Sequence, residues 1–255
     1  MGMIKTKEEI KLLKKSAEIS NSCIPLIEAL LKKEKITEKE IASAIRRKIY
    51  SHGAKLAFRT IVACGKRAAM IHAKPRATNK IISGLGYVDF GASYKGYKTD
   101  VTVPFIKGKI SKKEEKMVKA VMKAYELAFK SLKIGLPCFH LFEKVDKFLR
   151  KQGFRMQHPL GHGVGSKIHE LPTIGIPKEK LEKLRKKKKR KIEKLKKIRF
   201  QEGMVFTIEP AVYVKGLGGC RFENTVLLTK NGPLSLTNSK LLMTNKLKFL
   251  GSGGR

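Results

Sequence analysis

Two pairs of carboxylates are the residues in this sequence best suited to catalysis. In the first pair, two runs rich in β-branched and aromatic residues flank Tyr94-Lys95-Gly96, whose glycine can adopt the positive φ of a tight turn. A hairpin centred on Tyr94 and Lys95 places Asp89 directly opposite Asp100. Because like charges at facing positions of an antiparallel pair repel each other, we expect a shared proton or a bound cation between them.

The second pair comes from a second predicted hairpin. The strand-like runs 201–210 and 219–229 are joined by a turn centred on Gly216, and this register places Glu209 opposite Glu223. Carboxylates that face water are the alternative for each pair. Apolar residues on both sides of the two aspartates favour buried strands instead. These neighbours are Val88, Phe90, Val101 and Val103.

Three histidines can complete such a site. His162 lies in a glycine-rich loop that lets backbone approach closely, and its imidazole offers a neutral nitrogen. Four carboxylates and one imidazole suit two divalent first-row ions about 3.5–4 Å apart, which lower the pKa of a bridging water and polarise a carbonyl. Hydrolysis is therefore the expected reaction. His72 and His169 can donate a proton or hydrogen-bond a tetrahedral oxyanion, although a lone loop histidine is usually incidental.

The elements that must position these residues alternate between helices and strands. Capping boxes at Thr37 and Ser111 open two of the helices, and Pro25 interrupts the first. The order helix, helix, strands occurs twice, which suggests two similar halves. The predicted helices cover residues 7–31, 37–52, 111–132 and 141–151.

Composition excludes several classes of protein. The 255-residue chain is 42% hydrophobic and 31% charged, as in a globular domain, and no apolar run approaches the roughly 20 residues that span a bilayer. Four cysteines without a CxxC pair favour reduced thiols over a zinc knuckle or a disulfide framework. We therefore expect a cytoplasmic protein without membrane contact, with residues 250–255 as a tail outside the fold.

Positive charge is in large excess. The formal net charge is +36, and residues 178–199 alone hold fourteen basic and three acidic residues. Apolar residues recur within this segment at roughly heptad spacing, at Leu181, Leu184, Ile192, Leu195 and Ile198. We interpret it as a helix or helical hairpin inserted in a loop. It could contact nucleic acid or the ribosome; a solvated surface and a self-association seam are the alternatives.

The contexts of the five candidate ligands resemble those of the dinuclear "pita-bread" metallopeptidases, the family of methionine aminopeptidase, aminopeptidase P and prolidase. The resemblance extends over residues 5–240, and the motifs that carry it are VDFGASYKGYKTD, PLGHGVGSKIHELP, GMVFTIEP and GGCRFENTVLLT. It implies an α+β fold in which helices flank a curved central antiparallel sheet in two pseudo-symmetric halves. It also implies a single catalytic domain over residues 5–249.

The resemblance further implies a role for each ligand. Asp100 and Glu223 would bridge two divalent ions, with Mn²⁺ or Co²⁺ expected first and Fe²⁺ or Zn²⁺ as alternatives. Asp89 would chelate one ion, and His162 with Glu209 would hold the other. The two remaining histidines, at positions 72 and 169, would bind substrate and stabilise the transition state, with the carboxylate at 209 as a proton shuttle.

Within this family the sequence resembles the Xaa-Pro branch. The segment 58–65 followed by Ile71-His72-Ala73, and the short connection from Glu209 to Glu223, are similar to that branch. Aminopeptidase P and prolidase normally carry a further N-terminal domain, so the resemblance covers their catalytic domain only and leaves dipeptide specificity and oligomeric state open. We expect hydrolysis of the N-terminal bond of Xaa-Pro peptides by a metal-bridging hydroxide. The alternatives are a methionine aminopeptidase, or a degenerate site on a protein that binds ribosome or nucleic acid.

Overall fold

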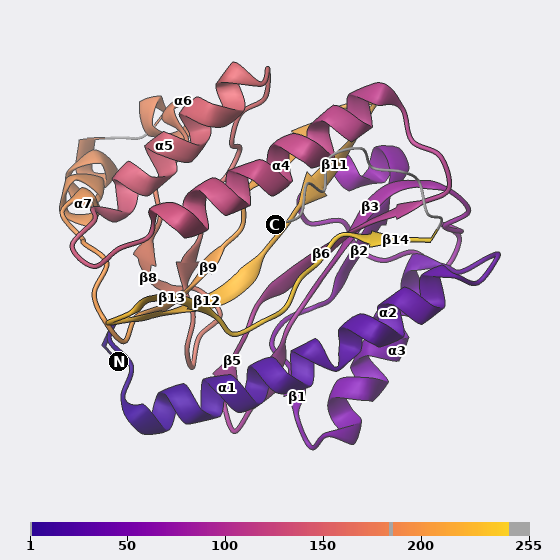
Figure 1. Ribbon diagram of the computed structural model, residues 1–255, viewed down its shortest axis with the longest axis horizontal. Helices are drawn as coiled ribbons and strands as arrows, with labels where there is room; N and C mark the ends of the chain where they lie inside the picture. The colour runs from indigo at the N-terminus through magenta and orange to yellow at the C-terminus, as the bar shows by residue number, and fades with distance from the viewer. Residues whose placement is uncertain (1, 184–185, 245–255) are drawn as a thin grey trace.

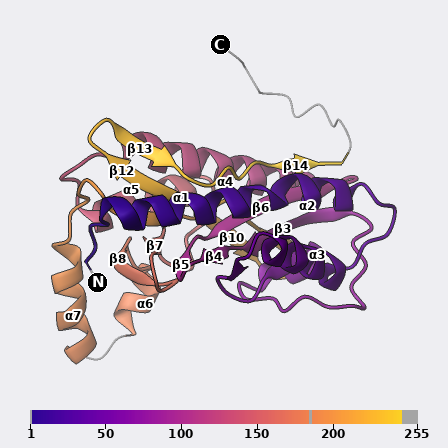
Figure 2. The same ribbon diagram turned by 90° about the horizontal axis from the view of Figure 1, so that it is seen from below.

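Helices lie along both sides of the strands in this chain (Figure 1). A computed structural model describes residues 2–183 and 186–244, so the predicted tail at 250–255 lies outside the described residues. One group of helices follows one side of the strands and a second group follows the other (Figures 1 and 2). The first group is α1 (Lys7–Asn21), α2 (Cys23–Leu31) and α3 (Glu38–Ser51), and the second is α4 (Lys112–Ser131) and α5 (Cys138–Lys151).

The predicted capping boxes form at the start of α3 and α4. Thr37 and Ser111 each accept a hydrogen bond from the backbone N–H three residues later, and the glutamate at that position accepts from the cap in return. A third capping box, at Thr6, opens α1. Helix α5 begins at Cys138, three residues before the predicted start.

The predicted helix over residues 7–31 is in fact two helices. Helix α1 ends at Asn21, and α2 begins two residues later at Cys23. Pro25 lies in the first turn of α2, where a helix has no intrahelical partner for backbone N–H groups. The proline therefore favours a new helix start, because its missing N–H is not needed there.

The strands form two larger sheets. One has the order β14-β6-β3-β2 and the other β13-β12-β9-β7-β8, and an isolated bridge between Thr102 and Glu223 joins them. All strand pairs in these two sheets are antiparallel except β14 with β6, which is parallel. The first sheet consists of β2 (Ile61–Cys64), β3 (Gly84–Phe90), β6 (Val101–Lys107) and β14 (Leu242–Met243). The second consists of β7 (His162–Gly163), β8 (Glu170–Thr173), β9 (Val205–Ile208), β12 (Asn224–Thr229) and β13 (Gly232–Ser235).

Two smaller sheets contain the other strands of the described residues. Helices pack against each of the two larger sheets. One small sheet has the order β1-β4-β5 and the other pairs β10 with β11. Separate apolar clusters bury α2 and α3 against the first larger sheet and α4 and α5 against the second. These strands are β1 (Lys55–Leu56), β4 (Ala92–Tyr94), β5 (Tyr97–Lys98), β10 (Ala211–Val214) and β11 (Gly218–Arg221).

The register predicted for the first hairpin is wrong by two residues. Lys95 and Gly96 both have positive φ, of 47° and 88°, and together form the two-residue turn. Asp89 therefore faces Thr102 instead of Asp100. Since side chains alternate with a period of two, a shift of two residues leaves both aspartates on the same face.

The register predicted for the second hairpin agrees with the structure on both sides of the glutamates. Ile208 faces Asn224, and Ala211 faces Arg221. Glu209 and Glu223 stand between these two pairs, at the end of β9 and the start of β12. The hairpin thus delivers both carboxylates to the junction of the two larger sheets.

Residues 178–199, which we call the lysine-rich segment, contain two helices in their described part. These are α6 (Lys178–Glu182) and α7 (Lys186–Lys196). Figure 2 shows α7 extending beyond the edge of the strands. The segment is anchored at its C-terminal end, where Ile192 is buried and Cys138 donates a backbone hydrogen bond to Ile198. No helix in the described part of the chain is long and apolar enough to cross a membrane.

Candidate metal centre

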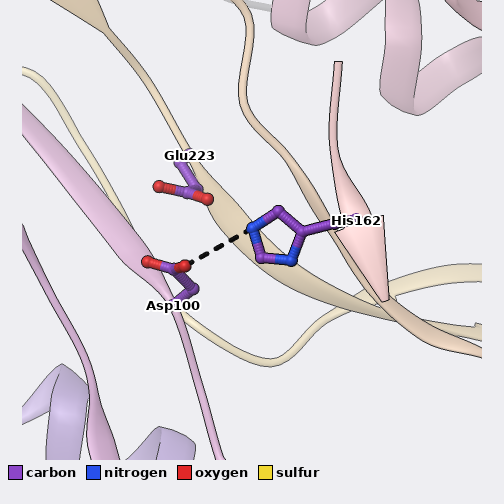
Figure 3. Close-up of side chains that lie close together, drawn as sticks. All are labelled: Asp100, His162 and Glu223. Atoms are coloured by element: carbon purple, nitrogen blue, oxygen red, sulfur yellow. Dashed lines mark ion pairs between the residues drawn. The ribbon is translucent and has the colours of Figure 1, made fainter. Parts of the chain in front are cut away.

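Three ligand-type side chains converge where the two larger sheets meet (Figure 3). Atoms of Asp100, His162 and Glu223 lie within 4.8 Å of one another, and Nε2 of His162 is 3.6 Å from Oδ2 of Asp100. Asp100 immediately precedes β6, Glu223 immediately precedes β12, and His162 begins β7. Three segments far apart in the sequence therefore supply one cluster.

The other two predicted ligands adjoin this cluster. Oε1 of Glu209 is 3.6 Å from Nε2 of His162, so that one imidazole nitrogen faces two carboxylates. Asp89 is 7% exposed and raises the pKa of the carboxyl groups of Asp100 and Glu223 through its charge. All five predicted ligands line one cavity of about 1150 Å³.

Burial leaves some of these carboxylate oxygens without partners. Oδ1 of Asp89 and Oδ1 of Asp100 are both buried, and neither has a hydrogen-bond partner in the described structure. A buried carboxylate oxygen without a hydrogen-bond partner destabilises the folded state. A divalent cation between these acids would satisfy both oxygens and offset the repulsion, so the residues present fit metal ions.

The pKa shifts of these residues also favour a metal site. Burial is the main cause that raises the pKa values of Asp100 and Glu223 well above their ordinary values, and neighbouring carboxylates add to it. Burial raises the pKa of Glu209 to about 8, although the nearby Arg221 opposes the change. Burial and the adjacent His169 lower the pKa of His162 to about 4. A neutral imidazole is the form that binds metal.

The two predicted substrate histidines line the same cavity. The rings of His162 and His169 are 4.3 Å apart and meet edge to face. His72 is exposed on the loop between η1 (Gly65–Ala69) and β3. Burial is the main cause that lowers the pKa of His169, and the neighbouring His72 adds to it. The structure thus brings all seven predicted residues to one cavity.

Arg221 was not among the predicted residues. It is 3% exposed, and its Nη2 forms an ion pair with Oδ2 of Asp89. Its Nε donates to Oγ1 of Thr102 at 3.0 Å, and that hydroxyl donates to Oε2 of Glu223 at 2.6 Å. Arg221 therefore links carboxylates from both hairpins. The available signal was its position two residues before Glu223, on the same strand face.

His158 was also missed. Its Nδ1 is 3.6 Å from Oε2 of Glu209 and 2.7 Å from the carbonyl oxygen of Pro159. Its Nε2 is 3.1 Å from the hydroxyl of Tyr213, which accepts from Nη1 of Arg221. Burial and the charge of Arg221 lower the pKa of His158 to about 3, so it is neutral at physiological pH. No periodic pattern singled out this histidine.

Solved structures share this architecture. An X-Pro aminopeptidase from Thermotoga maritima matches with a TM-score of 0.82 at 30% identity, over 94% of this chain and 64% of that one. Prolidase from Pyrococcus furiosus matches with a TM-score of 0.81 at 33% identity, over 93% and 66%. The fold is therefore the α+β pita-bread fold of metallopeptidases, as the sequence predicted.

Sequence comparisons identify the family. The family model for metallopeptidase family M24 matches residues 11–230. The Xaa-Pro dipeptidase of Pyrococcus furiosus is 34% identical over 246 residues, which are 94% of this chain and 64% of that protein. An uncharacterized peptidase of Methanocaldococcus jannaschii is 36% identical over 243 residues, with 94% and 65% covered. The chain belongs to metallopeptidase family M24, and it spans less than two thirds of the length of these relatives.

Proposed function

We propose that the protein is a dinuclear-metal exopeptidase that hydrolyses the N-terminal bond of short peptides, with a preference for proline at the second position. The cluster of Asp100, His162 and Glu223 within 4.8 Å at a cavity wall is the observation that supports it most directly. The similarity to proteins named Xaa-Pro dipeptidase and X-Pro aminopeptidase supports the proline preference.

Five side chains would hold the metal in this proposal. Asp89, Asp100, His162, Glu209 and Glu223 would together hold two divalent ions. Mn²⁺ or Co²⁺ is expected first, with Fe²⁺ or Zn²⁺ as alternatives, because carboxylate-rich sites accept several ions. Bound ions would supply a water of lowered pKa and polarise the scissile carbonyl.

The remaining steps are assigned to side chains of the chain itself. Glu209 would take up the proton of the attacking water and deliver it to the leaving amine. Its carboxylate lines the cavity and lies 3.6 Å from both His158 and His162. His72 and His169 orient the substrate and donate hydrogen bonds to the oxyanion. His158 and His162 approach different oxygens of the Glu209 carboxylate, each at 3.6 Å.

A peptide panel tests the proposal. Protein supplied with Mn²⁺ or Co²⁺ is assayed against Ala-Pro, Met-Pro-Xaa and Met-Ala-Xaa peptides. Cleavage of the first two supports an Xaa-Pro peptidase. Cleavage of Met-Ala-Xaa alone would identify a methionine aminopeptidase. No cleavage of any peptide at full metal occupancy would reject both and leave a degenerate site.

Metal content provides a second measurement. His162→Ala is expected to lose both bound metal and turnover, because it removes the nitrogen that faces two carboxylates. His140→Ala is the matched control, since His140 lies exposed on α5 and outside the cavity. Equal metal content in the two variants would remove His162 from the ligand set.

We also propose a second role for the lysine-rich segment, in binding nucleic acid. Residues 183–191 contain eight basic residues and no acidic one. Figure 2 shows α7 extending away from the strands, where a polyanion could approach it. Neutralised phosphates release counterions, so such binding would weaken steeply with salt.

Replacing the eight basic residues of 183–191 by glutamine tests this role. The flanking residues are kept because Lys180 lines the cavity and Ile192 is buried. RNA affinity at low salt should fall about tenfold or more, with a shallower salt dependence. The control neutralises Lys112, Lys116 and Lys123 on α4. Unchanged RNA retention in the first variant would reject the role.

A further inference from the structure

Four exposed cations surround the mouth of the cavity. They come from four different segments: the β1–β2 connection, the loop after η1, the β7–β8 connection and α6. All four side chains line the same cavity as the metal-type ligands. The four residues, which we call the cationic rim, are Arg59, Lys74, Lys167 and Lys180.

Three of these cations stand next to residues of the candidate site. Lys74 follows His72 by two residues, and Lys167 precedes His169 by two. Arg59 precedes Ile61 by two residues, and Ile61 is the strand partner of Asp89. Three of the four rim cations are therefore close in sequence to residues that the proposed function assigns to the substrate, or to the strand partner of a proposed metal ligand.

Within the described residues, the rim cations have no acidic ion-pair partner. Glu170 is the one lining acid outside the five candidate ligands, and its Oε2 is 2.5 Å from Nζ of the buried Lys5. The other oxygen of Glu170 accepts a hydrogen bond from the backbone N of Lys167 at 2.9 Å. None of the four rim side chains forms an ion pair with any residue in the described ranges.

Lys180 brings part of the lysine-rich segment into the cavity wall. Its neighbour Glu179 points elsewhere and pairs with Arg150 and Arg155, at 3.1 and 3.3 Å. Lys180 itself lines the cavity together with the candidate ligands. Lys180 is therefore part of the cavity wall and is also exposed at the surface.

We propose that the cationic rim selects peptides that carry carboxylates downstream of the cleaved bond. This inference rests on the proposed peptidase function. Four cations that line one cavity and have no ion-pair partner in the described ranges attract anionic segments and disfavour cationic ones. The carboxylates can be aspartate or glutamate side chains, or the terminal carboxylate of a short peptide.

Four peptides separate these sources. Ala-Pro-Glu-Glu amide and Ala-Pro-Gln-Gln amide differ only in side-chain charge. The free acid and the amide of Ala-Pro-Gln-Gln differ only in the charge of the C-terminus. Ala-Pro-Lys-Lys amide adds a cationic competitor. The unaltered protein should show a higher kcat/KM for either anionic form than for its neutral counterpart, and the preference should shrink at high salt because exposed charges are screened.

The variant Lys74→Gln/Lys167→Gln measures the contribution of the rim. The ratio of kcat/KM between acidic and neutral peptide should fall about fivefold, since one exposed charge pair contributes a factor of about two to five. Lys112→Gln/Lys123→Gln on α4 makes the same change in net charge and should leave the ratio unaltered. Cleavage of every peptide with the same kcat/KM would contradict the proposed selectivity of the cationic rim. So would equal ratios of kcat/KM between acidic and neutral peptide in the two variants. No cleavage by the unaltered protein would instead reject the peptidase function.

Discussion

Glu38, the first residue of α3, is fully buried and accepts two hydrogen bonds from the guanidinium of Arg67, at 3.2 and 3.1 Å. The same carboxylate accepts from the backbone N of Arg76 at 3.1 Å and from Nδ2 of Asn79 at 2.6 Å. These donors flank His72 on both sides in the sequence. One buried acid therefore fixes the loop that presents this histidine to the cavity.

Glu38→Gln should lower the free energy of unfolding by about 2–3 kcal/mol, because hydrogen bonds to a charged group are lost. It should also raise KM, since the loop that carries His72 loses its anchor. Urea unfolding and steady-state kinetics measure the two effects. Glu40→Ala, which removes the side-chain contacts to Thr37 at the start of the same helix, should cost about 1 kcal/mol without changing KM. Equal KM values in both variants would contradict the positioning role of Glu38.

Arg221→Ala should be among the most damaging single changes in the chain. It leaves Asp89 without its buried counter-charge and the Tyr213 hydroxyl without its donor. The free energy of unfolding of the metal-free protein should fall by about 3–5 kcal/mol. Arg221→Lys keeps the charge but cannot donate to Asp89, Thr102 and Tyr213 together. We expect it to fold and to lose most turnover, and a fully active lysine variant would show that charge alone suffices.

Metal removal should destabilise the folded chain measurably. The carboxylates gathered around Asp100 raise one another's pKa values, and a cation would reverse this penalty. At a free metal concentration of 100 times Kd, binding adds about 2.7 kcal/mol to the free energy of unfolding. Thermal unfolding of chelator-treated protein, titrated with Mn²⁺, measures the effect. His162→Ala should show a much smaller rise in Tm, and an equal rise would place the ions elsewhere.

The metal-free protein should be most stable at mildly acidic pH. The pKa of His158 is lowered from 6.5 to about 3, so the unfolded chain binds more protons between these values and stability falls as pH drops through them. The pKa of Glu209 is raised from 4.5 to about 8, so the folded chain binds more protons there and stability falls as pH rises from 4.5 to 8. The raised pKa values of Asp100 and Glu223 act in the same direction as Glu209.

Urea unfolding of the metal-free protein across pH 4–8 measures this dependence. Between pH 6.5 and 8 only the raised carboxyl groups contribute among these residues, so stability should decline as pH rises. Glu209→Gln should flatten part of that decline. A metal-free stability that increases from pH 6.5 to 8 would show that these acids are already ionised and compensated.

The two hairpins show how well a local sequence pattern predicts strand register. The second register was predicted correctly because a single glycine turn sets it. The first was displaced by two residues, because Lys95 joins Gly96 in positive φ, and a non-glycine residue seldom does so. The displacement kept Asp89 and Asp100 on one face, since the side-chain period along a strand is two.

Local sequence patterns predicted the two hairpins with their four acidic residues and the capping boxes at Thr37 and Ser111, because each depends on residue types at short spacing. The fold and the roles of the ligands and histidines were expected from the resemblance of longer motifs to the metallopeptidase family. The tertiary structure decided the rest. Arg221 and His158 became site residues only when strands from both halves met, and the cationic rim joins four segments that no sequence pattern connects. Packing sets distances between residues far apart in the chain, and those distances determine which charges compensate one another.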